Sequence, residues 1–250
     1  MRLQHSYCGV GVGIWVRRDY AMRNLIAGAL IVSAVVTANG RRVVADGVSG
    51  APNTASIQRR RTVLFDGVTL KGWNGDPGIW SVKDGAIHGV SEKGSQLILS
   101  DGVYSDFRLI LKSRLLSASN HLGVCFWGER EADWGYGDCI LVIPPTGHFW
   151  DYHPGMSDDP AYEKFAHPDF DPHVWHETEI LARRKTGVVR VAVNGVELTR
   201  YTDKDPARLK QGPIGLQIHT GASEVEYKDI EIEIDPKEDQ LVTVKTTNHS

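Results

Sequence analysis

The pattern of apolar and polar positions between residues 62 and 235 is that of a chain built from short β-strands. In the stretch FRLILKSRL, Phe107, Leu109 and Leu111 alternate with charged residues, as in a strand that buries one face. LGVCFW and DCILVI are two further apolar stretches of strand length. Because none of the longer segments repeats its apolar residues with a period of about 3.6, we predict an all-β domain.

Turn signals join these stretches into hairpins. Asp84 and Gly85 stand between two apolar runs, and Asn194 and Gly195 repeat the arrangement. Such pairs tolerate the positive φ of a two-residue turn. Near the end of the domain, VEYKDIEIEI shifts its apolar phase by one residue, as a β-bulge does. About ten to twelve short strands with these turns predict a concanavalin-like jelly-roll β-sandwich of two antiparallel sheets.

One connection is much longer than the others. Residues 153–174 are rich in proline and contain no strand pattern. A loop of this length inside a compact domain is usually functional or disordered. Its aromatic residues Tyr162, Phe165 and Phe170 favour an ordered flap.

The chain opens with a segment typical of a secretory signal. From Met22 a short basic start precedes an apolar run, Leu25 to Val36. Val36 and Ala38 stand at the two positions that signal peptidase recognises. The run is shorter than the ~20 residues of a transmembrane span. We therefore predict a signal peptide over residues 1–38, with Met22 as an alternative true start.

Two alternatives to this signal stay open. Arg17 and Arg18 precede the apolar run at a distance that suits a twin-arginine signal, and an uncleaved anchor is the other. We predict an exported protein, periplasmic or extracellular, with no transmembrane span after cleavage. Its parts are a linker over residues 39–61, a domain over 62–235 and a polar tail over 236–250.

Composition is that of a soluble globular protein, with 41% apolar and 24% charged residues. The net charge of −3 and the lack of a basic stripe predict no nucleic-acid partner. Cleavage after residue 38 removes four arginines and Asp19, which takes the charge from −3 to −6, and it also removes Cys8. Cys125 and Cys139 remain. In an oxidising compartment they form either a disulfide or two buried thiols, and both alternatives stay open.

The stretch GHFWDYHPG, residues 147–155, is dense in groups able to bind or react. Sugars pack their C–H faces on aromatic rings and need fixed polar partners for their hydroxyls, so this mixture predicts a carbohydrate site. The candidate rings are Trp127, Trp134, Tyr136, Trp150 and Tyr152. The alternative is that such rings fill the core, as we expect of Trp73, Trp80 and Trp175.

Ionisable residues in the same region suit bond cleavage. Ordinary glycoside hydrolysis uses two carboxylates, and the candidates are Glu129, Asp133, Asp138 and Asp151. Elimination from a 3-keto sugar needs one base and a group that stabilises the enolate, and Asp151 or His153 suits the base. Glu129 and Asp133 also fit solvated loop charges.

Gln217 and His219 alternate with the aliphatic residues Leu216 and Ile218. Because successive side chains of a strand point to opposite faces, both polar residues should face away from the core. There we expect them to meet His121 and the tryptophans. The alternative is a capped surface histidine.

Metal binding is weakly indicated. Five histidines fall close together in the chain, at His148, His153, His167, His173 and His176, but their spacing fits no zinc motif. Oxygen donors for Ca²⁺ stand nearby without an EF-hand pattern, at Asp158, Asp159, Asp169 and Asp171. No cofactor is assigned, and a divalent cation such as calcium stays open.

The stretches LFDGVTLKGW, FRLILKSRL, GPIGLQIHTG and VEYKDIEIEI resemble the motifs of the 3-keto-disaccharide hydrolase-like family over residues 63–234. The resemblance implies a concanavalin-like jelly roll, bacterial export, and hydrolysis of glycosides oxidised at C3. Family members carry a GYE motif where this chain reads GYG. Gly137 therefore stands at the position of the family glutamate, and Asp138 follows it.

These observations predict an exported protein that cleaves a 3-keto-disaccharide or 3-keto-glycoside by hydrolysis or by elimination and hydration. Asp151 and His153 are the predicted proton-transfer groups, with Asp138 as a supporting carboxylate and residues 153–174 as a flap. The predicted substrate contacts are His121, Trp127, Glu129, Trp134, Tyr136, Trp150, Tyr152, Gln217 and His219. The alternative is a non-catalytic, lectin-like module. The sugar, its linkage and the oligomeric state stay undetermined.

Overall fold

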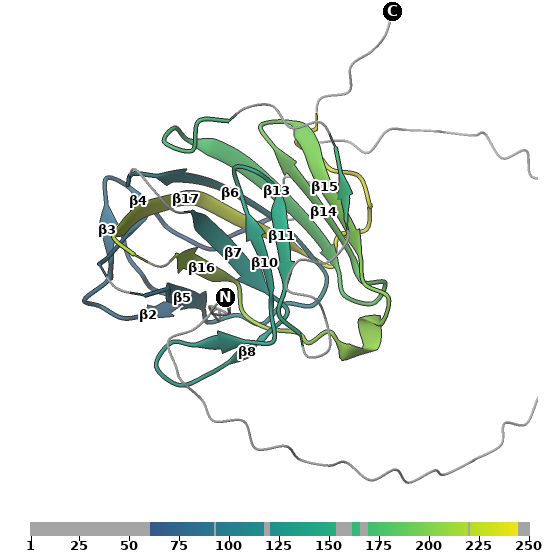
Figure 1. Cartoon of the computed structure of the whole chain (residues 1–250), viewed down its shortest axis with the longest axis horizontal. Coiled ribbons are helices and arrows are strands. Elements are labelled where there is room, and N and C mark those ends of the chain that lie inside the picture. The colour runs from purple at the N-terminus through teal and green to yellow at the C-terminus, as the bar shows by residue number, and fades with distance from the viewer. Residues whose placement is uncertain are drawn as a thin grey trace, which may run out of the picture. The chain divides into compact units, whose positions relative to one another are not determined.

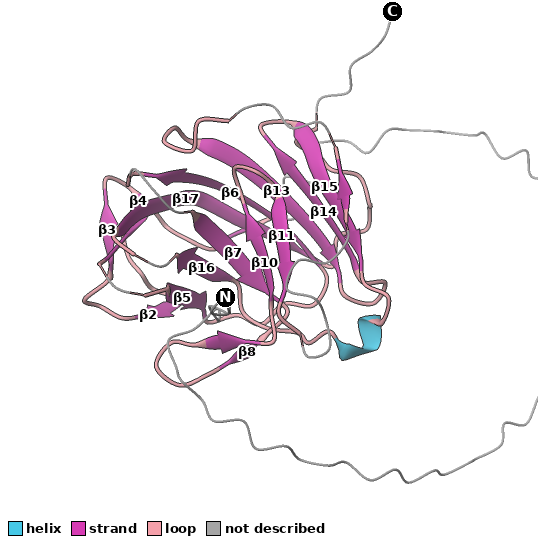
Figure 2. Cartoon of the chain, viewed as in Figure 1, coloured by secondary structure: helices cyan, strands magenta, loops and turns pink. Residues whose placement is uncertain are grey.

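The computed structural model describes residues 61–92, 94–117, 121–153, 162–165, 170–219 and 221–244. Almost all regular structure in these ranges is β-strand, with a single 3-10 turn, η1 (Pro206–Arg208), as Figure 2 shows. Two large antiparallel sheets form the two layers of a sandwich (Figure 1). The all-β, two-sheet prediction is confirmed.

The larger sheet has nine strands. Eight follow one another in the order β12 (Glu163–Lys164), β15 (Val196–Thr202), β14 (Val188–Val193), β13 (His176–Arg183), β6 (Phe107–Leu115), β17 (Ser223–Ile234), β4 (Ala86–Ser91) and β3 (Trp80–Lys83). The ninth, β1 (Thr62–Val63), also pairs with β17.

The smaller sheet has six strands in the order β11 (His148–Asp151), β10 (Ile140–Ile143), β7 (Leu122–Phe126), β16 (Gly215–Ile218), β5 (Gln96–Ser100) and β2 (Trp73–Gly75). A separate hairpin is formed by β8 (Glu129–Arg130) and β9 (Tyr136–Gly137).

The main core lies between the sheets because each strand alternates its side chains. Phe107 and Leu109 of β6 and Leu216 of β16 are fully buried in it. Each such side chain contributes roughly 1.5–3 kcal/mol through burial. Trp73 and Trp80 also belong to the core, as predicted.

The predicted turns and bulge are present. Asp84 and Gly85 have φ of 50° and 75°, and Asn194 and Gly195 have 49° and 84°. The register of β17 against β6 shifts between Lys228 and Glu231, at the predicted phase change. These local signals therefore fix the hairpins and the irregularity of β17.

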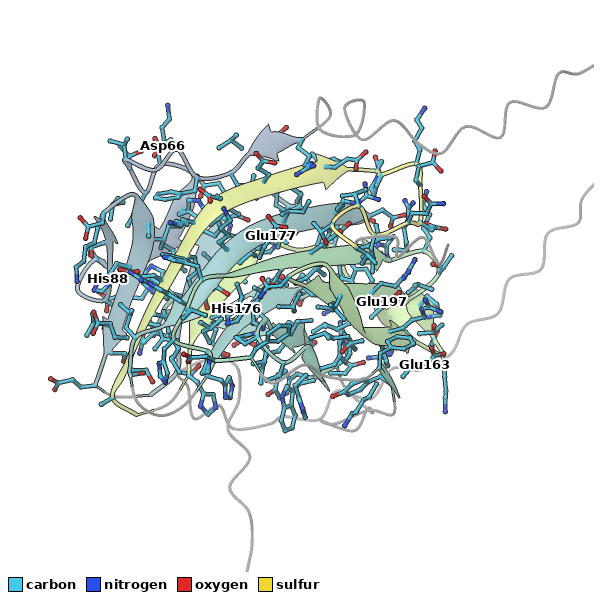
Figure 3. All side chains as sticks on the ribbon, turned by 90° about the horizontal axis from the view of Figure 1, so that it is seen from above. Asp66, His88, Glu163, His176, Glu177 and Glu197 are labelled. Atoms are coloured by element: carbon cyan, nitrogen blue, oxygen red, sulfur yellow. The ribbon has the colours of Figure 1, made fainter. Side chains whose placement is uncertain are left out.

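Ion pairs cover the outer face of the nine-stranded sheet, where Figure 3 labels His88, Glu177 and Glu197. The ring nitrogens of His88 lie 3.4 Å from carboxylate oxygens of Glu224 and Glu226. Trp175 was predicted to fill the core, which is wrong. Its half-buried ring instead lies under the guanidinium of Arg114 at 4.6 Å and the ammonium of Lys228 at 4.1 Å.

The C-terminal segment is held against this outer face up to residue 244. Arg108 is fully buried and pairs with the carboxylates of Glu179 and Glu233. It also donates to the carbonyl oxygens of Glu238 and Gln240, at 3.0 and 2.8 Å. The predicted polar tail is therefore packed structure in its described part, because its backbone supplies acceptors to a buried cation.

The predicted signal and linker lie outside the described residues, apart from the last linker position, Arg61. Of the predicted flap, residues 154–161 and 166–169 also lie outside them. The described residues 163 and 164 form β12, which pairs with β15. Within the described ranges, no helix has the length and apolarity needed to cross a bilayer.

Candidate functional site

The candidate site lies on the outer face of the six-stranded sheet, the side turned away from the main core. On β16, Leu216 and Ile218 pack in that core, so Gln217 faces outward as predicted. On β11, Phe149 packs in the core, so His148 and Trp150 face outward. The alternation of single residues therefore selects which side chains a ligand can meet.

Three histidines from three places in the sequence meet on this face, and we call His121, His148 and His219 the histidine cluster. The rings of His121 and His219 are stacked, with centroids 3.8 Å apart. The ring of His148 lies 4.8 Å from that of Trp150. His121, His219 and Trp150 thus lie on one face, as predicted, but the histidine in contact with Trp150 is His148, whereas His121 and His219 contact each other.

His121 has an unusual environment for a histidine. Burial, together with the positive charge that His219 and His148 carry when protonated, lowers the pKa of His121 from 6.5 to about 4. Its Nε2 is buried and makes no hydrogen bond within the described residues. At neutral pH the ring is therefore uncharged, with one ring nitrogen unprotonated.

Gln217 is fixed on the same face by close packing. Its Nε2 donates to Oγ of Ser95 at 3.0 Å. A side chain on the neighbouring Gly123 would place its Cβ only 2.7 Å from Oε1 of Gln217 and 2.3 Å from Leu141. Glycine at 123 therefore leaves room for the Gln217 amide across β7.

A second group of ionisable residues is buried, and we call Asp151, His153, Tyr201, Asp203 and Arg208 the Asp151 network. Nδ1 of His153 lies 2.8 Å from Oδ1 of Asp151. Oδ2 of Asp151 accepts from the Tyr201 hydroxyl at 2.9 Å and from Arg208 at 2.6 Å. Arg208 also donates to Asp203. Every member of the network is therefore tied to another.

The pKa values of Asp151 and Tyr201 reflect these hydrogen bonds. Burial raises the pKa of the Asp151 carboxyl, but hydrogen bonds from His153 and Arg208 outweigh it and bring that pKa to about 2. Burial and the Asp151 charge raise the pKa of Tyr201. Asp151 is thus held as a carboxylate.

The structure does not place Asp151 and His153 on the candidate face. Asp151 follows Trp150 on β11, so the two side chains point to opposite sides of the sheet. Asp151 is fully buried and His153 is 3% exposed, with its Nε2 3.0 Å from the Trp127 carbonyl oxygen. Catalysis by these two residues stays a prediction, and the geometry favours a structural role.

Other predicted contacts are distributed over several places. Trp127 is fully buried and donates to the Ser105 carbonyl at 2.7 Å, so it belongs to the interior. The hydroxyl of Tyr136 is buried and donates to the Pro213 carbonyl at 2.6 Å. Burial therefore keeps Trp127 and Tyr136 away from a ligand. Tyr152 is half-buried beside the outer-face apolar cluster that includes Leu141.

The predicted carboxylates Glu129 and Asp138 lie at the β8–β9 hairpin. Both pair with Lys210, with oxygens 2.9 and 3.3 Å from its ammonium nitrogen. Asp138 and Asp151 therefore do not share a cleft, because one is paired at the hairpin and the other is buried. Trp134, at the tip of this hairpin, is exposed.

Gly137 lies beside another carboxylate of the hairpin. A Cβ at this position would lie 2.0 Å from Oε1 of Glu131, in the turn that follows β8. The contact is with the end of a flexible side chain, which can move aside. A carboxylate is present there although the chain reads GYG.

Neither cysteine pairing nor a metal site is seen in the described part of the chain. Cys125 and Cys139 are both buried thiols and are not joined by a disulfide. Among the described residues, no group of three or more His, Cys, Asp or Glu side chains is arranged to hold a metal ion. His167, Asp158, Asp159 and Asp169 lie outside those residues, while Asp171 accepts from the backbone of His173.

Sequence reasoning missed His148 and Tyr162 as members of the site. His148 stands two residues before Trp150, and the period of a strand would have placed both on one face. The ring of Tyr162 lies 6.0 Å from that of His148. Since Tyr162 comes from the long connection after β11, no local pattern indicates this contact.

Comparison with known proteins agrees with the fold. Residues 60–233 match the family model described as the 3-keto-alpha-glucoside-1,2-lyase-like domain. A candidate glycosyl hydrolase from Parabacteroides distasonis is similar at 19% identity and a TM-score of 0.54, over 74% of this chain and 98% of that one. The carbohydrate-binding module CBM66 from Bacillus subtilis is similar at 17% identity and 0.50, over 65% and 95%. No curated protein matches. These likenesses confirm the jelly-roll fold.

Proposed function

Because the chain belongs to the 3-keto-alpha-glucoside-1,2-lyase-like family, we propose that it cleaves a 3-keto-glycoside by elimination across C1 and C2. The reaction would take place on the outer face of the six-stranded sheet. One observation carries the proposal. The histidine cluster, with its uncharged His121, shares this face with Gln217, and its member His148 lies beside Trp150.

The chemistry requires a base that is unprotonated in the resting protein, as His121 is at neutral pH. A ketone at C3 acidifies the proton on C2, and the unprotonated ring nitrogen of His121 takes that proton. The C2–H electrons form an enolate. Its collapse restores the ketone, forms the C1=C2 bond and breaks the bond from C1 to the leaving oxygen. That oxygen receives the proton from the imidazolium. Water adding to C1 of the enone afterwards would give net hydrolysis.

The remaining groups of the face suit binding. Trp150 offers a half-buried ring for the C–H face of a sugar, and Gln217 offers a fixed amide for a hydroxyl. Tyr162 adds a ring beside His148. The sugar would therefore rest between the histidine cluster and the aromatic edge formed by β11.

The test is release of 4-nitrophenol from the 3-keto form of 4-nitrophenyl α-glucoside, with the unoxidised glucoside as the parent control. We expect release from the keto form alone, with a C1=C2 product visible by NMR. In D₂O, deuterium should enter C2 of recovered substrate if proton removal is reversible. His121→Gln should lower the rate of release by about 10²–10⁴-fold. His88→Gln, on the outer face of the other sheet, is the matched control and should retain it.

The alternative is a non-catalytic carbohydrate-binding module. Gly137, which replaces the family glutamate, favours this alternative. Binding of the keto sugar without release would support it and reject the enzyme. Release that survives His121→Gln would keep the enzyme but reject the base assigned to it.

We also propose that the protein is exported, from the basic start and apolar run that begin at Met22. Expression of the full chain in a Gram-negative host, followed by N-terminal sequencing of the periplasmic protein, tests this. The expected mature start is Asn39. Recovery of the intact N-terminus in the membrane fraction would indicate an anchor instead.

A further inference from the structure

The β8–β9 hairpin carries an exposed tryptophan on strained backbone. Trp134 is 37% exposed, and both Asp133 and Trp134 have positive φ, at 53° and 57°. For a bulky residue this conformation is an outlier. Such strain persists only where the surroundings enforce it, and it is concentrated at ligand sites.

Contacts with the rest of the domain hold the ring in place. Nε1 of Trp134 donates to Oδ1 of Asn74 on β2 at 3.0 Å. Arg130 donates to the Ser100 carbonyl on β5. At the base of the hairpin, Tyr136 donates to the Pro213 carbonyl at 2.6 Å. The hairpin is therefore anchored to the sheet, and the hydrogen bond from Nε1 holds one edge of the exposed indole before any ligand binds.

The ring forms one side of a pocket, which we call the hairpin pocket. It has a volume of about 300 Å³ and is lined by Asn74, Leu99, Arg130, Glu131, Asp133 and Trp134. One aromatic ring with several convergent polar groups suits a sugar, whose C–H face can pack on the ring while its hydroxyls bond to the polar groups. Arg130 offers donors, and Glu131 and Asp133 offer acceptors.

The hairpin pocket and Trp150, at the other edge of the sheet, lie on the same face but far apart. One row of paired residues crosses the whole sheet, through Trp150, Leu141, Cys125, Gly215, Leu99 and Asn74. Five interstrand steps of roughly 4.8 Å give about 24 Å along the sheet from Trp150 to Asn74. A single sugar ring cannot contact both ends.

We propose that the hairpin pocket is a second carbohydrate subsite, in which Trp134 stacks on a sugar ring remote from the bond that is cleaved. The inference rests on the proposed function, since it assumes a glycan on the outer face. It makes the substrate an extended oligosaccharide rather than a disaccharide. Binding energy from the remote ring then helps to position the reacting ring.

The test compares short and long glucans by calorimetry on the full chain, using the disaccharide and hexasaccharide of the malto-, cello- and laminari- series. We expect at least one hexasaccharide to bind ten-fold or more tightly than its disaccharide. Trp134→Ala should bring that ratio close to one, and Trp134→Tyr should restore most of it. Trp175→Ala removes an aromatic ring from the other sheet and should leave the ratio unchanged.

The proposal would be overturned if hexasaccharide and disaccharide bound equally tightly in all three series. It would also be overturned if the hexasaccharide preference remained in Trp134→Ala. Release from the 3-keto glucoside is measured on the same preparations. If 4-nitrophenol is released but the hexasaccharide binds no more tightly than the disaccharide, only the subsite is rejected. Neither release nor sugar binding rejects the proposed function together with it.

Discussion

Two histidines of this domain, His153 in the Asp151 network and His121 in the histidine cluster, differ sharply in their surroundings. His153 has an oxygen partner at each ring nitrogen and is almost fully buried. His121 has a stacked histidine for a neighbour and an Nε2 with no hydrogen bond within the described residues. The same side chain thus serves as a structural donor in one place and as a candidate base in the other. Partners and burial, not residue type, decide between these roles.

The contrast arises within one short strand. Trp150 faces outward and Asp151 faces the interior, because neighbours on a strand alternate. The dense stretch GHFWDYHPG therefore supplies two separate regions. His148 and Trp150 contribute to the candidate site, whereas Asp151 and His153 join β11 to the loop that carries Arg208.

The largest effect is expected from a substitution within the Asp151 network. Asp151→Ala removes one of the two buried carboxylates that Arg208 and Tyr201 contact, so that only Asp203 remains to them, and it takes the partner of Nδ1 from His153. Removal of one partner from a buried ion pair costs about 3–5 kcal/mol. Urea denaturation should show this loss in the free energy of unfolding. Asp138→Ala, which removes a partly exposed carboxylate, is the control and should cost less than about 1 kcal/mol. Equal losses in the two variants would mean that Asp151 is not structural.

The second effect separates activity from stability. His121→Gln should lower the rate of keto-glucoside cleavage by about 10²–10⁴-fold, the usual contribution of a general base. Its unfolding free energy at pH 7 should change little. His153→Gln should instead lower stability, because it disturbs two buried hydrogen bonds. Steady-state rates and urea curves on both variants check this. The reverse pattern would return the catalytic role to His153.

Alternation in the sequence predicts much of the fold and part of the site. Because Leu216 and Ile218 are aliphatic, the outward direction of Gln217 follows directly. On β11 the pattern is ambiguous, since each face carries one aromatic and one ionisable residue, Phe149 with Asp151 and His148 with Trp150. The partner that keeps Asp151 inside, Arg208, lies 57 residues further along the chain. Only tertiary structure brings that charge to it.

Burial of charge is the general feature that local patterns miss. Arg108 alternates with apolar residues like a solvent-facing side chain, yet it is fully buried. It is covered by backbone from the segment around Gln240, 132 residues away. A polar stretch at the end of a chain gives no local sign of that packing.

The third effect is on the pH dependence of stability, to which His121 and Asp151 contribute in different pH ranges. The folded pKa of His121 is about 4, below its ordinary 6.5, so the unfolded chain takes up a proton first as pH falls. Stability should therefore decline by about 2–3 kcal/mol between pH 6.5 and 4. Asp151 acts in a lower window, because its stabilisation is lost only as pH falls from 3.8 towards 2.

Urea curves collected from pH 7 to 3 check these windows. In His121→Gln the decline above pH 4 should shrink by the stated amount, while His88→Gln serves as the matched control. An unchanged decline in His121→Gln would show that His121 titrates normally and would weaken its assignment as a buried, neutral base.

The smallest effect concerns the hairpin. Trp134→Gly relieves a left-handed backbone that costs other residues about 1–2 kcal/mol. It also removes the hydrogen bond to Asn74, worth about 0.5–1.5 kcal/mol, and frees the unfolded chain. These terms oppose one another, so the unfolding free energy should stay within about 1 kcal/mol of wild type. Trp150→Gly, on a strand with ordinary φ, loses packing without such relief and should cost about 2–3 kcal/mol. Equal losses would mean that Trp134 is held for stability. A neutral Trp134→Gly that no longer distinguishes long from short glucans would show that the strain serves the ligand.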